Sequence, residues 1–291
     1  MYGECFAGGA LCLHKLQSTM KITYRTGLAA LLVVGACSAV LLAAEAPKEV
    51  PKTLNAAELA GATLIIPSPG EILSTLKEAK DSDWAAAAEA RAKGITPVEK
   101  MDSTQAAVLL GRRTAEAFLA LEAKDADLLN KASAQILDSA RKLGASEGIL
   151  AQGKDISDLA AAEKWGDIYS LLDGVFLSAQ SDLKEVEDDD SLTIASASGW
   201  LTGIGIFADQ VSGKYSEGAG KALRQGDLAK SLNEKLAALS AGAKDQASVK
   251  AMIAAFAKIQ PLVTVDQDAA VSEASVKEIA SIANAALASL K

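Results

Sequence analysis

The chain has 291 residues, half of them hydrophobic, and its 29 basic and 37 acidic residues give a formal net charge of −8. This excess of negative charge disfavours nucleic acid and anionic membrane surfaces as partners, because both attract basic proteins. The length is sufficient for the chain to bury a core of its own without disulfides.

Residues 20–44 are predicted to be a secretory signal peptide, because basic residues open the segment and an uncharged run rich in Ala, Leu and Val follows. Residues 1–19 would then be upstream sequence read from an early start codon. We expect cleavage after Ala43 or Ala44, and a periplasmic or secreted protein of a bacterial-type cell. Two alternatives stay open. A lipoprotein box that ends at Cys37 would make this residue a lipid anchor, and the apolar run is long enough to remain as an uncleaved membrane anchor.

The predicted signal segment contains the one histidine, His14, and all three cysteines, Cys5, Cys12 and Cys37. The mature chain is therefore expected to lack disulfides, zinc or iron sites built from Cys and His, and any Ser-His-Asp or Cys-His mechanism. It would keep 26 basic and 36 acidic residues, which gives a net charge of −10. No cofactor is predicted.

A Pro-rich linker or extended arm is expected at residues 45–69, followed by an all-helical domain over residues 70–291. Prolines disfavour a helix in the arm. In the rest, Ala, Leu, Lys and Glu dominate, with apolar residues three and four positions apart. Two extended connectors are predicted, at 95–97 and 261–265. The predicted helices are 71–79, 83–93, 103–123, 125–143, 157–163, 167–187, 191–212, 216–223, 227–240, 245–259 and 272–290.

Four turns share a pattern in which a basic residue precedes an aspartate by three positions and an apolar residue follows it. The four aspartates are Asp83, Asp127, Asp167 and Asp227. The basic residue suits the negative carboxyl end of one helix, and the aspartate is expected to cap the next helix. The pattern therefore predicts stacked antiparallel helical hairpins.

The helix at 191–212 is predicted to be the central one, since its first 18 residues carry no charge. Small residues recur every four positions in two predicted helices: Ala195, Gly199 and Gly203 in this one, and Ala107, Gly111 and Ala115 in the helix at 103–123. Such stripes let two helix backbones approach closely. The predicted fold is all-α, with stacked hairpins forming one irregular bundle around this small-residue helix.

Two adjacent arginines interrupt the apolar helix at 103–123. Arg112 is expected to pair with Glu116 one turn later. Arg113 would point inward, where it needs a buried acid, or it would capture a carboxylate or phosphate of a ligand.

Aromatic residues are scarce, which makes Trp200 and Tyr215 conspicuous. Core packing is the first interpretation of both. The alternative is a groove lined by Trp200 and Tyr215 near a Gly-rich hinge at 213–221, with Arg224 close by, that binds a ligand or a partner peptide.

The densest charge cluster runs from Glu187 to Asp190. It is expected to form a solvated turn in which Asp190 or Ser191 caps the central helix. Calcium binding by Glu187, Asp188 and Asp190 is the alternative, although the usual loop with a glycine at the sixth place is missing.

Together these features favour a non-catalytic protein that acts as an interaction or scaffold module for an envelope protein or peptide. A small-molecule binder or sensor is the second hypothesis, and a carboxylate-based enzyme is the third. The three hypotheses require, respectively, an exposed apolar groove, a pocket with converging polar groups, and two carboxylates with perturbed ionisation in one cleft.

Overall fold

A computed structural model of the chain describes residues 83–91, 98–186 and 188–290. The predicted signal peptide, the Pro-rich arm, the helix at 71–79 and the connector at 95–97 lie outside these residues. Every regular element in the described part is helical, so the all-α prediction is confirmed. The elements are α3 (Trp84–Arg91), the 3-10 turn η2 (Val98–Lys100), α4 (Ser103–Ala123), α5 (Ala126–Lys142), α6 (Glu147–Ala161), α7 (Trp165–Glu185), α8 (Asp189–Ser212), α9 (Glu217–Ala222), α10 (Gly226–Ala238), α11 (Ala241–Asp245), α12 (Ala247–Val263) and α13 (Glu273–Ser289).

Helices α4 and α8 cross at very short distance, as the small-residue stripes predict. A Cβ atom built on Gly111 of α4 would lie 1.8 Å from the carbonyl oxygen of Ala195 and 2.7 Å from the backbone nitrogen of Gly199. The hydroxyl of Ser198 also donates to the carbonyl of Val108 across the crossing, at 2.7 Å. Only a residue without a side chain fits at position 111.

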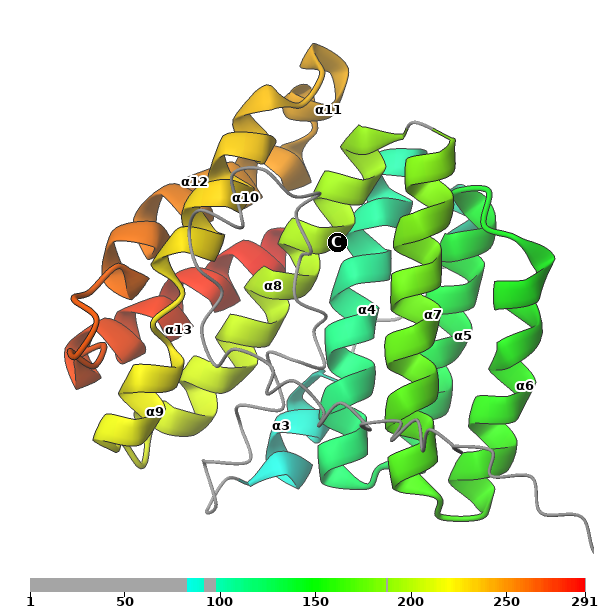
Figure 1. Cartoon of the computed structure of the whole chain (residues 1–291), viewed down its shortest axis with the longest axis horizontal. Helices are drawn as coiled ribbons and strands as arrows, with labels where there is room; N and C mark the ends of the chain where they lie inside the picture. Colours follow the sequence, from blue (N-terminus) through cyan, green and yellow to red (C-terminus); the bar gives the residue numbers. More distant parts are fainter. Residues whose placement is uncertain (1–82, 92–97, 187, 291) are drawn as a thin grey trace, which may run out of the picture. The chain divides into compact units, whose positions relative to one another are not determined.

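Helix α8 lies between two groups of helices (Figure 1). On one side each of α4, α5 and α6 contacts the next helix along the chain, and α7 contacts α4 again, so α7 lies beside α4 in Figure 1. On the other side α13 packs along α8, and α10 and α12 complete the group. The short helix α3 lies against α4 and α8. This arrangement places α8 in the middle of the described helices.

The burial of α8 explains its unusual composition. By length and composition alone it would be able to cross a membrane, and it is the one such helix in the described residues. However, 94% of its most apolar window is buried inside the protein. Apolar side chains all round a helix are expected when other helices cover every face, so α8 has the properties of a core helix.

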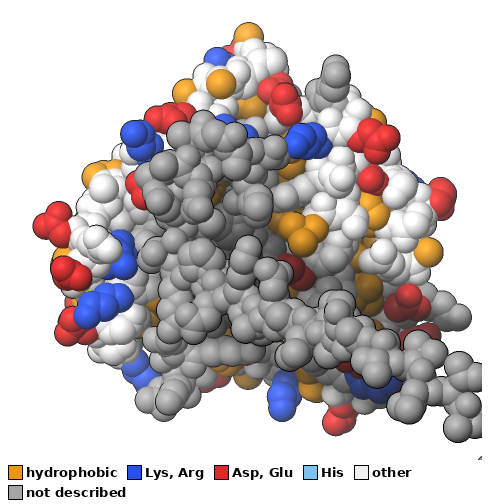
Figure 2. Space-filling view, viewed as in Figure 1, with side chains coloured by type: hydrophobic (Ala, Val, Ile, Leu, Met, Phe, Trp, Pro, Cys, Tyr) orange, Lys and Arg blue, Asp and Glu red, His pale blue; other side chains and the backbone are white. Residues whose placement is uncertain are grey.

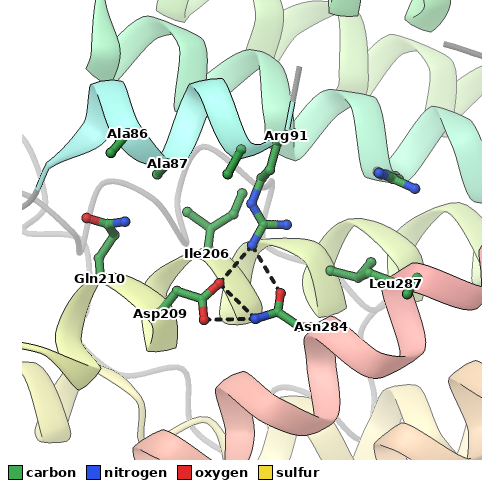
Figure 3. A pocket seen from close by; sticks show the side chains of 11 residues that line it. Ala86, Ala87, Arg91, Ile206, Asp209, Gln210, Asn284 and Leu287 are labelled. Atoms are coloured by element: carbon green, nitrogen blue, oxygen red, sulfur yellow. Dashed lines mark hydrogen bonds and ion pairs between the residues drawn. The ribbon is translucent and has the colours of Figure 1, made fainter. Parts of the chain in front are cut away.

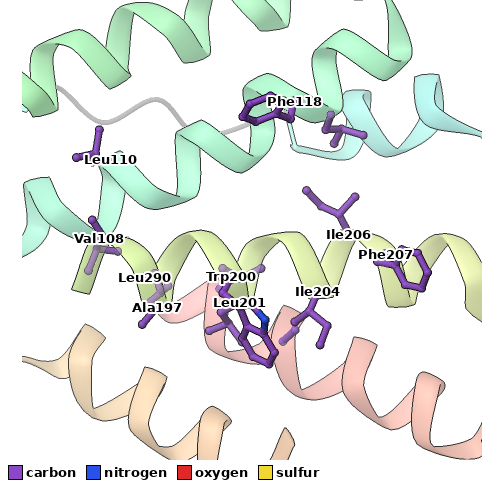
Figure 4. Packing of buried hydrophobic residues seen from close by; sticks show 14 of the residues in the cluster. Val108, Leu110, Phe118, Ala197, Trp200, Leu201, Ile204, Ile206, Phe207 and Leu290 are labelled. Carbon is purple, nitrogen blue, oxygen red and sulfur yellow. The ribbon is translucent and has the colours of Figure 1, made fainter. Parts of the chain in front are cut away.

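The hydrophobic core follows α8 and continues into both groups of helices (Figure 4). Trp200 of α8 packs on Phe256 of α12 with ring centroids 4.9 Å apart. Phe118 of α4 meets Tyr169 of α7 edge to face at 5.2 Å. Burial of one such side chain contributes about 2–3 kcal/mol, so these aromatic pairs help to join α8 to α12 and α4 to α7.

The shared turn pattern predicts the helix caps only in part. Asp83 caps α3 as expected, because its carboxylate accepts a first-turn backbone amide at 3.0 Å. In the second copy the cap is Asp125, which accepts a backbone amide at 2.9 Å. Asp127, Asp167 and Asp227 lie inside the first turns of α5, α7 and α10. Their charge still complements the helix dipole there, so the pattern marks where a helix starts but not which residue caps it.

Helix α6 is longer than predicted, because it begins at Glu147 and not at residue 157. Glycines at 148 and 153 lower the helix propensity of its first half. Ile149 and Ile156 are buried, seven positions apart on one face. Packing of this face outweighs the weak propensity.

The predicted helix at 245–259 is wrong at both ends. Helix α11 ends at Asp245, and α12 runs from Ala247 to Val263, through Pro261. The predicted extended connector at 261–265 is therefore helical in its first half. Ile259 and Val263 are fully buried on either side of the proline, and their packing keeps the last turn helical although the proline removes one backbone hydrogen bond.

Candidate functional site

A cleft of about 510 Å³ opens between α3, α8 and α13, with one residue of α4 in its wall (Figure 3). It combines charged, amide and apolar side chains. The residues that line it are Ala86, Ala87, Ala90, Arg91, Arg112, Ile206, Asp209, Gln210, Asn284, Leu287 and Ala288.

Three polar side chains from three helices meet in this cleft (Figure 3). Nη2 of Arg91, the last residue of α3, donates to Oδ2 of Asp209 at 3.1 Å and to Oδ1 of Asn284 at 3.4 Å. Nδ2 of Asn284 donates to both carboxylate oxygens of Asp209, at 2.8 and 3.0 Å. The three side chains therefore hold one another in place.

Arg112 is the second cation in the wall of the cleft. Its Nε donates to Oε1 of Glu116 at 2.9 Å, which confirms the predicted pair, and its Nη1 donates to the carbonyl of Leu290 at 3.3 Å. Glu116 is completely buried and also forms an ion pair with Arg113. Arg113 thus points inward to a buried acid, as predicted for its structural role, and it does not line the cleft.

The charges in the cleft wall are two cations, Arg91 and Arg112, and one anion, Asp209. Burial lowers the pKa of Arg91 below its ordinary value, and Arg112 lowers it further, whereas Asp209 and Glu116 raise it. A guanidinium remains charged at neutral pH all the same. The cleft is thus a local cationic feature in an acidic chain, whose described acidic and basic side chains are otherwise interspersed on the face shown in Figure 2.

Not all hydrogen-bond donors of the two arginines are used. Within the described residues, Nε and Nη1 of Arg91 and Nη2 of Arg112 make no hydrogen bond. A guanidinium carries five N–H donors in a fixed planar fork. Donors therefore remain for a group that enters the cleft.

Of the residues that were predicted to form a groove, Trp200 lies in the core. Its side chain is 1% exposed, and its Nε1 donates to Oε1 of Gln225 at 2.7 Å. Together with the contact to Phe256, this position agrees with core packing and leaves the side chain no open groove to line.

Tyr215 and Arg224 are half-buried, and neither lines the cleft. The hydroxyl of Tyr215 donates to the carbonyl of Val271 at 2.8 Å. Gly220 is packed so tightly against the same carbonyl that a Cβ would lie 2.6 Å from it. This part of the Gly-rich segment 213–221, which was expected to be a hinge, is therefore held in place.

The acidic cluster serves the ends of helices in the described structure. Asp188 accepts the backbone amide of Ser191 at 3.0 Å, so Asp188 caps α8 and the prediction of Asp190 or Ser191 is wrong. Asp190 accepts the backbone amide of Ser240 at 3.2 Å. Glu187 lies outside the described residues, and those residues contain no group of three His, Cys, Asp or Glu side chains that could hold a metal ion.

Sequence reasoning missed Arg91, Asp209 and Asn284. They are 118 and 75 residues apart along the chain, and each resembles an ordinary surface residue of a helix. One signal was available for Asp209, because it is the residue at which the uncharged run of α8 ends.

Comparison of the chain with protein-family models, with curated proteins and with solved structures found no match.

Proposed function

We propose that the protein is an exported, non-catalytic helical protein of the cell envelope that binds a small ligand in the cleft between α3, α8 and α13. The observation that carries this proposal is the contact of Arg91 with Asp209 and Asn284, which brings polar groups from three helices to one place. Polar groups that converge beside apolar side chains in one cleft are typical of small-molecule sites. Stacked hairpins around α8 would give such a site a rigid frame.

The other two hypotheses find less support in the described residues. A scaffold for another protein requires an exposed apolar surface. Leu177 and Val186 are the large hydrophobic residues that are exposed in the described part of the chain. They are nine positions apart, Leu177 within α7 and Val186 directly after its last residue, so they do not share one face of this helix. A carboxylate-based enzyme requires two acids in one cleft, and Asp209 is the one carboxylate in this wall.

The proposal can be tested with two matched tryptophan variants of α3. Ala90 lines the cleft, whereas Ala85 is exposed on the same helix and does not line it. Ala90→Trp should fill the cleft, and Ala85→Trp should leave it open. The probe is a defined mixture of hexanoate, hexanamide, hexylamine and glucose, with saturation-transfer NMR on the full chain as the readout.

We expect at least one of these compounds to bind the unmodified protein and the Ala85→Trp variant but not the Ala90→Trp variant. The proposal is overturned if none of them binds, or if the Ala90→Trp variant binds everything that the unmodified protein binds.

A further inference from the structure

We infer that the ligand of this cleft is a monocarboxylate with a short apolar tail, and that Arg91 and Arg112 hold its carboxylate. This inference rests on the proposed binding function and names the class of ligand. It goes beyond that function because it assigns a charge and a shape to the molecule that binds.

The first reason to expect a carboxylate is that Arg91 has hydrogen-bond donors to spare. Its Nη2 is occupied by Asp209 at 3.1 Å and by Asn284 at 3.4 Å, whereas its Nε and Nη1 have no hydrogen-bond partner among the described residues. Each remaining N–H group can donate one charge-assisted hydrogen bond to a carboxylate oxygen. Nη2 of Arg91 is thus fixed by the protein, and a carboxylate can accept one hydrogen bond from Arg91 and another from Nη2 of Arg112, which also has no partner among the described residues.

Both arginines are held in position before any ligand arrives. Arg91 is 12% exposed and Arg112 is 18% exposed. Arg112 is anchored by Glu116 and by the carbonyl of Leu290. Because binding then orders few side chains, more of the interaction energy contributes to affinity.

The charge of the wall favours a single negative charge on the ligand. With the ion pairs behind the wall included, three arginines (Arg91, Arg112 and Arg113) face two carboxylates (Asp209 and Glu116), so one positive charge remains to attract an anion. A phosphate dianion would bring a second negative charge close to Asp209 without a further cation to compensate it. A carboxylate carries one negative charge, which the one remaining positive charge balances.

The rest of the cleft favours a short apolar tail. Three alanines of α3 form one side of it, and Ile206 and Leu287 form the opposite side (Figure 3). The small alanine side chains leave a volume of about 510 Å³, which lies toward the lower end of the range for small-molecule sites. A chain of a few methylene groups would bury its surface there and leave its charged end beside the arginines.

The test compares hexanoate with its neutral amide, hexanamide, and with inorganic phosphate by isothermal titration of the full chain. We expect saturable binding of hexanoate. Hexanamide should bind at least about tenfold more weakly, because hydrogen bonds to a charged group are stronger than neutral ones. Phosphate should bind more weakly than hexanoate.

Three variants test whether the charges of the cleft wall determine the binding. Arg91→Gln should lower the affinity for hexanoate by about tenfold or more, whereas Arg141→Gln, which removes an exposed cation paired with Asp138, should not change it. Asp209→Asn keeps the shape of the side chain but removes the offsetting charge, so it should raise the affinity by about threefold. If Asp209→Asn acted only by loosening the cleft, the affinity for hexanoate would fall instead.

Equal affinity for hexanamide, tighter binding of phosphate, or full hexanoate affinity in the Arg91→Gln variant would each overturn the assignment of a monocarboxylate. If hexanamide or hexylamine binds and Ala90→Trp abolishes that binding, the cleft remains a ligand site and only the ligand class is wrong. If none of the compounds binds, both proposals fail.

Discussion

Gly111 of α4 and Ala195 of α8 touch backbone to backbone, with 1.8 Å between the carbonyl oxygen of Ala195 and the place where a Cβ of residue 111 would lie. The next residue in the chain, Arg112, lines the cleft. The crossing therefore fixes the position of one of the two cations relative to α8, which also carries Asp209. The fold and the candidate site depend on the same contact.

We predict that Gly111→Ala destabilises the protein by about 2–4 kcal/mol, because α4 and α8 would have to move apart to admit the new methyl group. Urea denaturation of the unmodified protein and of the variant measures the effect. Gly174→Ala in α7 is the matched control, since nothing lies within 4 Å of its added Cβ. It should stabilise the protein by up to about 1 kcal/mol through helix propensity. Equal stability of the two variants would contradict the close crossing.

Glu116 is the buried acid shared by Arg112 and Arg113. Glu116→Gln removes the negative charge and leaves two arginines next to each other in the interior. We predict a loss of about 3–5 kcal/mol in the free energy of unfolding, measured by chemical denaturation. As a control, Asp138→Asn breaks the exposed pair with Arg141 and should cost less than about 1 kcal/mol. A similar small effect for both variants would show that Glu116 is not needed to compensate the arginines.

Trp200→Phe tests whether this aromatic residue acts in the core or in a binding groove. The substitution removes the donor to Gln225 and part of the packing against Phe256. We expect a loss of about 2–3 kcal/mol in stability and no change in the binding of hexanoate, because Trp200 does not line the cleft.

The matched variant Tyr215→Phe removes only the hydroxyl that donates to Val271, and it should cost about 1 kcal/mol. Impaired hexanoate binding by Trp200→Phe without a loss of stability would instead favour the groove that the sequence suggested.

The export proposal has a direct test in the N-terminus of the exported protein. Signal peptidase should cut after Ala43 or Ala44, where small residues follow the apolar run. N-terminal sequencing of protein recovered from the periplasm or the medium should therefore begin at Ala44 or Glu45. A blocked N-terminus at Cys37 would favour the lipoprotein alternative, and a sequence that begins before Met20 would exclude the predicted signal peptide.

The helices were predictable where local pattern and packing agree. The predicted bounds of α4 match the structure, since Asp102 caps its start and apolar residues recur through its length. Gly144, just after the end of α5, has the left-handed backbone conformation that glycine favours at helix ends. Prediction failed where packing overrides local preference, as at the first half of α6 and at Pro261 in α12.

The cleft was not predictable for a different reason. Its polar core joins the end of α3, the end of α8 and the middle of α13, and only the packing of these helices brings Arg91, Asp209 and Asn284 together. Arg112 was recognised as unusual because it lies in an apolar helix and has an acid four positions later. Arg91 has no such neighbour in the sequence.

The central place of α8 also constrains how the protein is made. Its apolar surface is covered by α4 on one side and by α13 on the other, and α13 is the last helix of the described chain. A fragment that stops after residue 212 would leave that surface in water and is expected to aggregate. During synthesis the same surface stays exposed until α13 emerges, so the described helices cannot finish folding before this helix has been made.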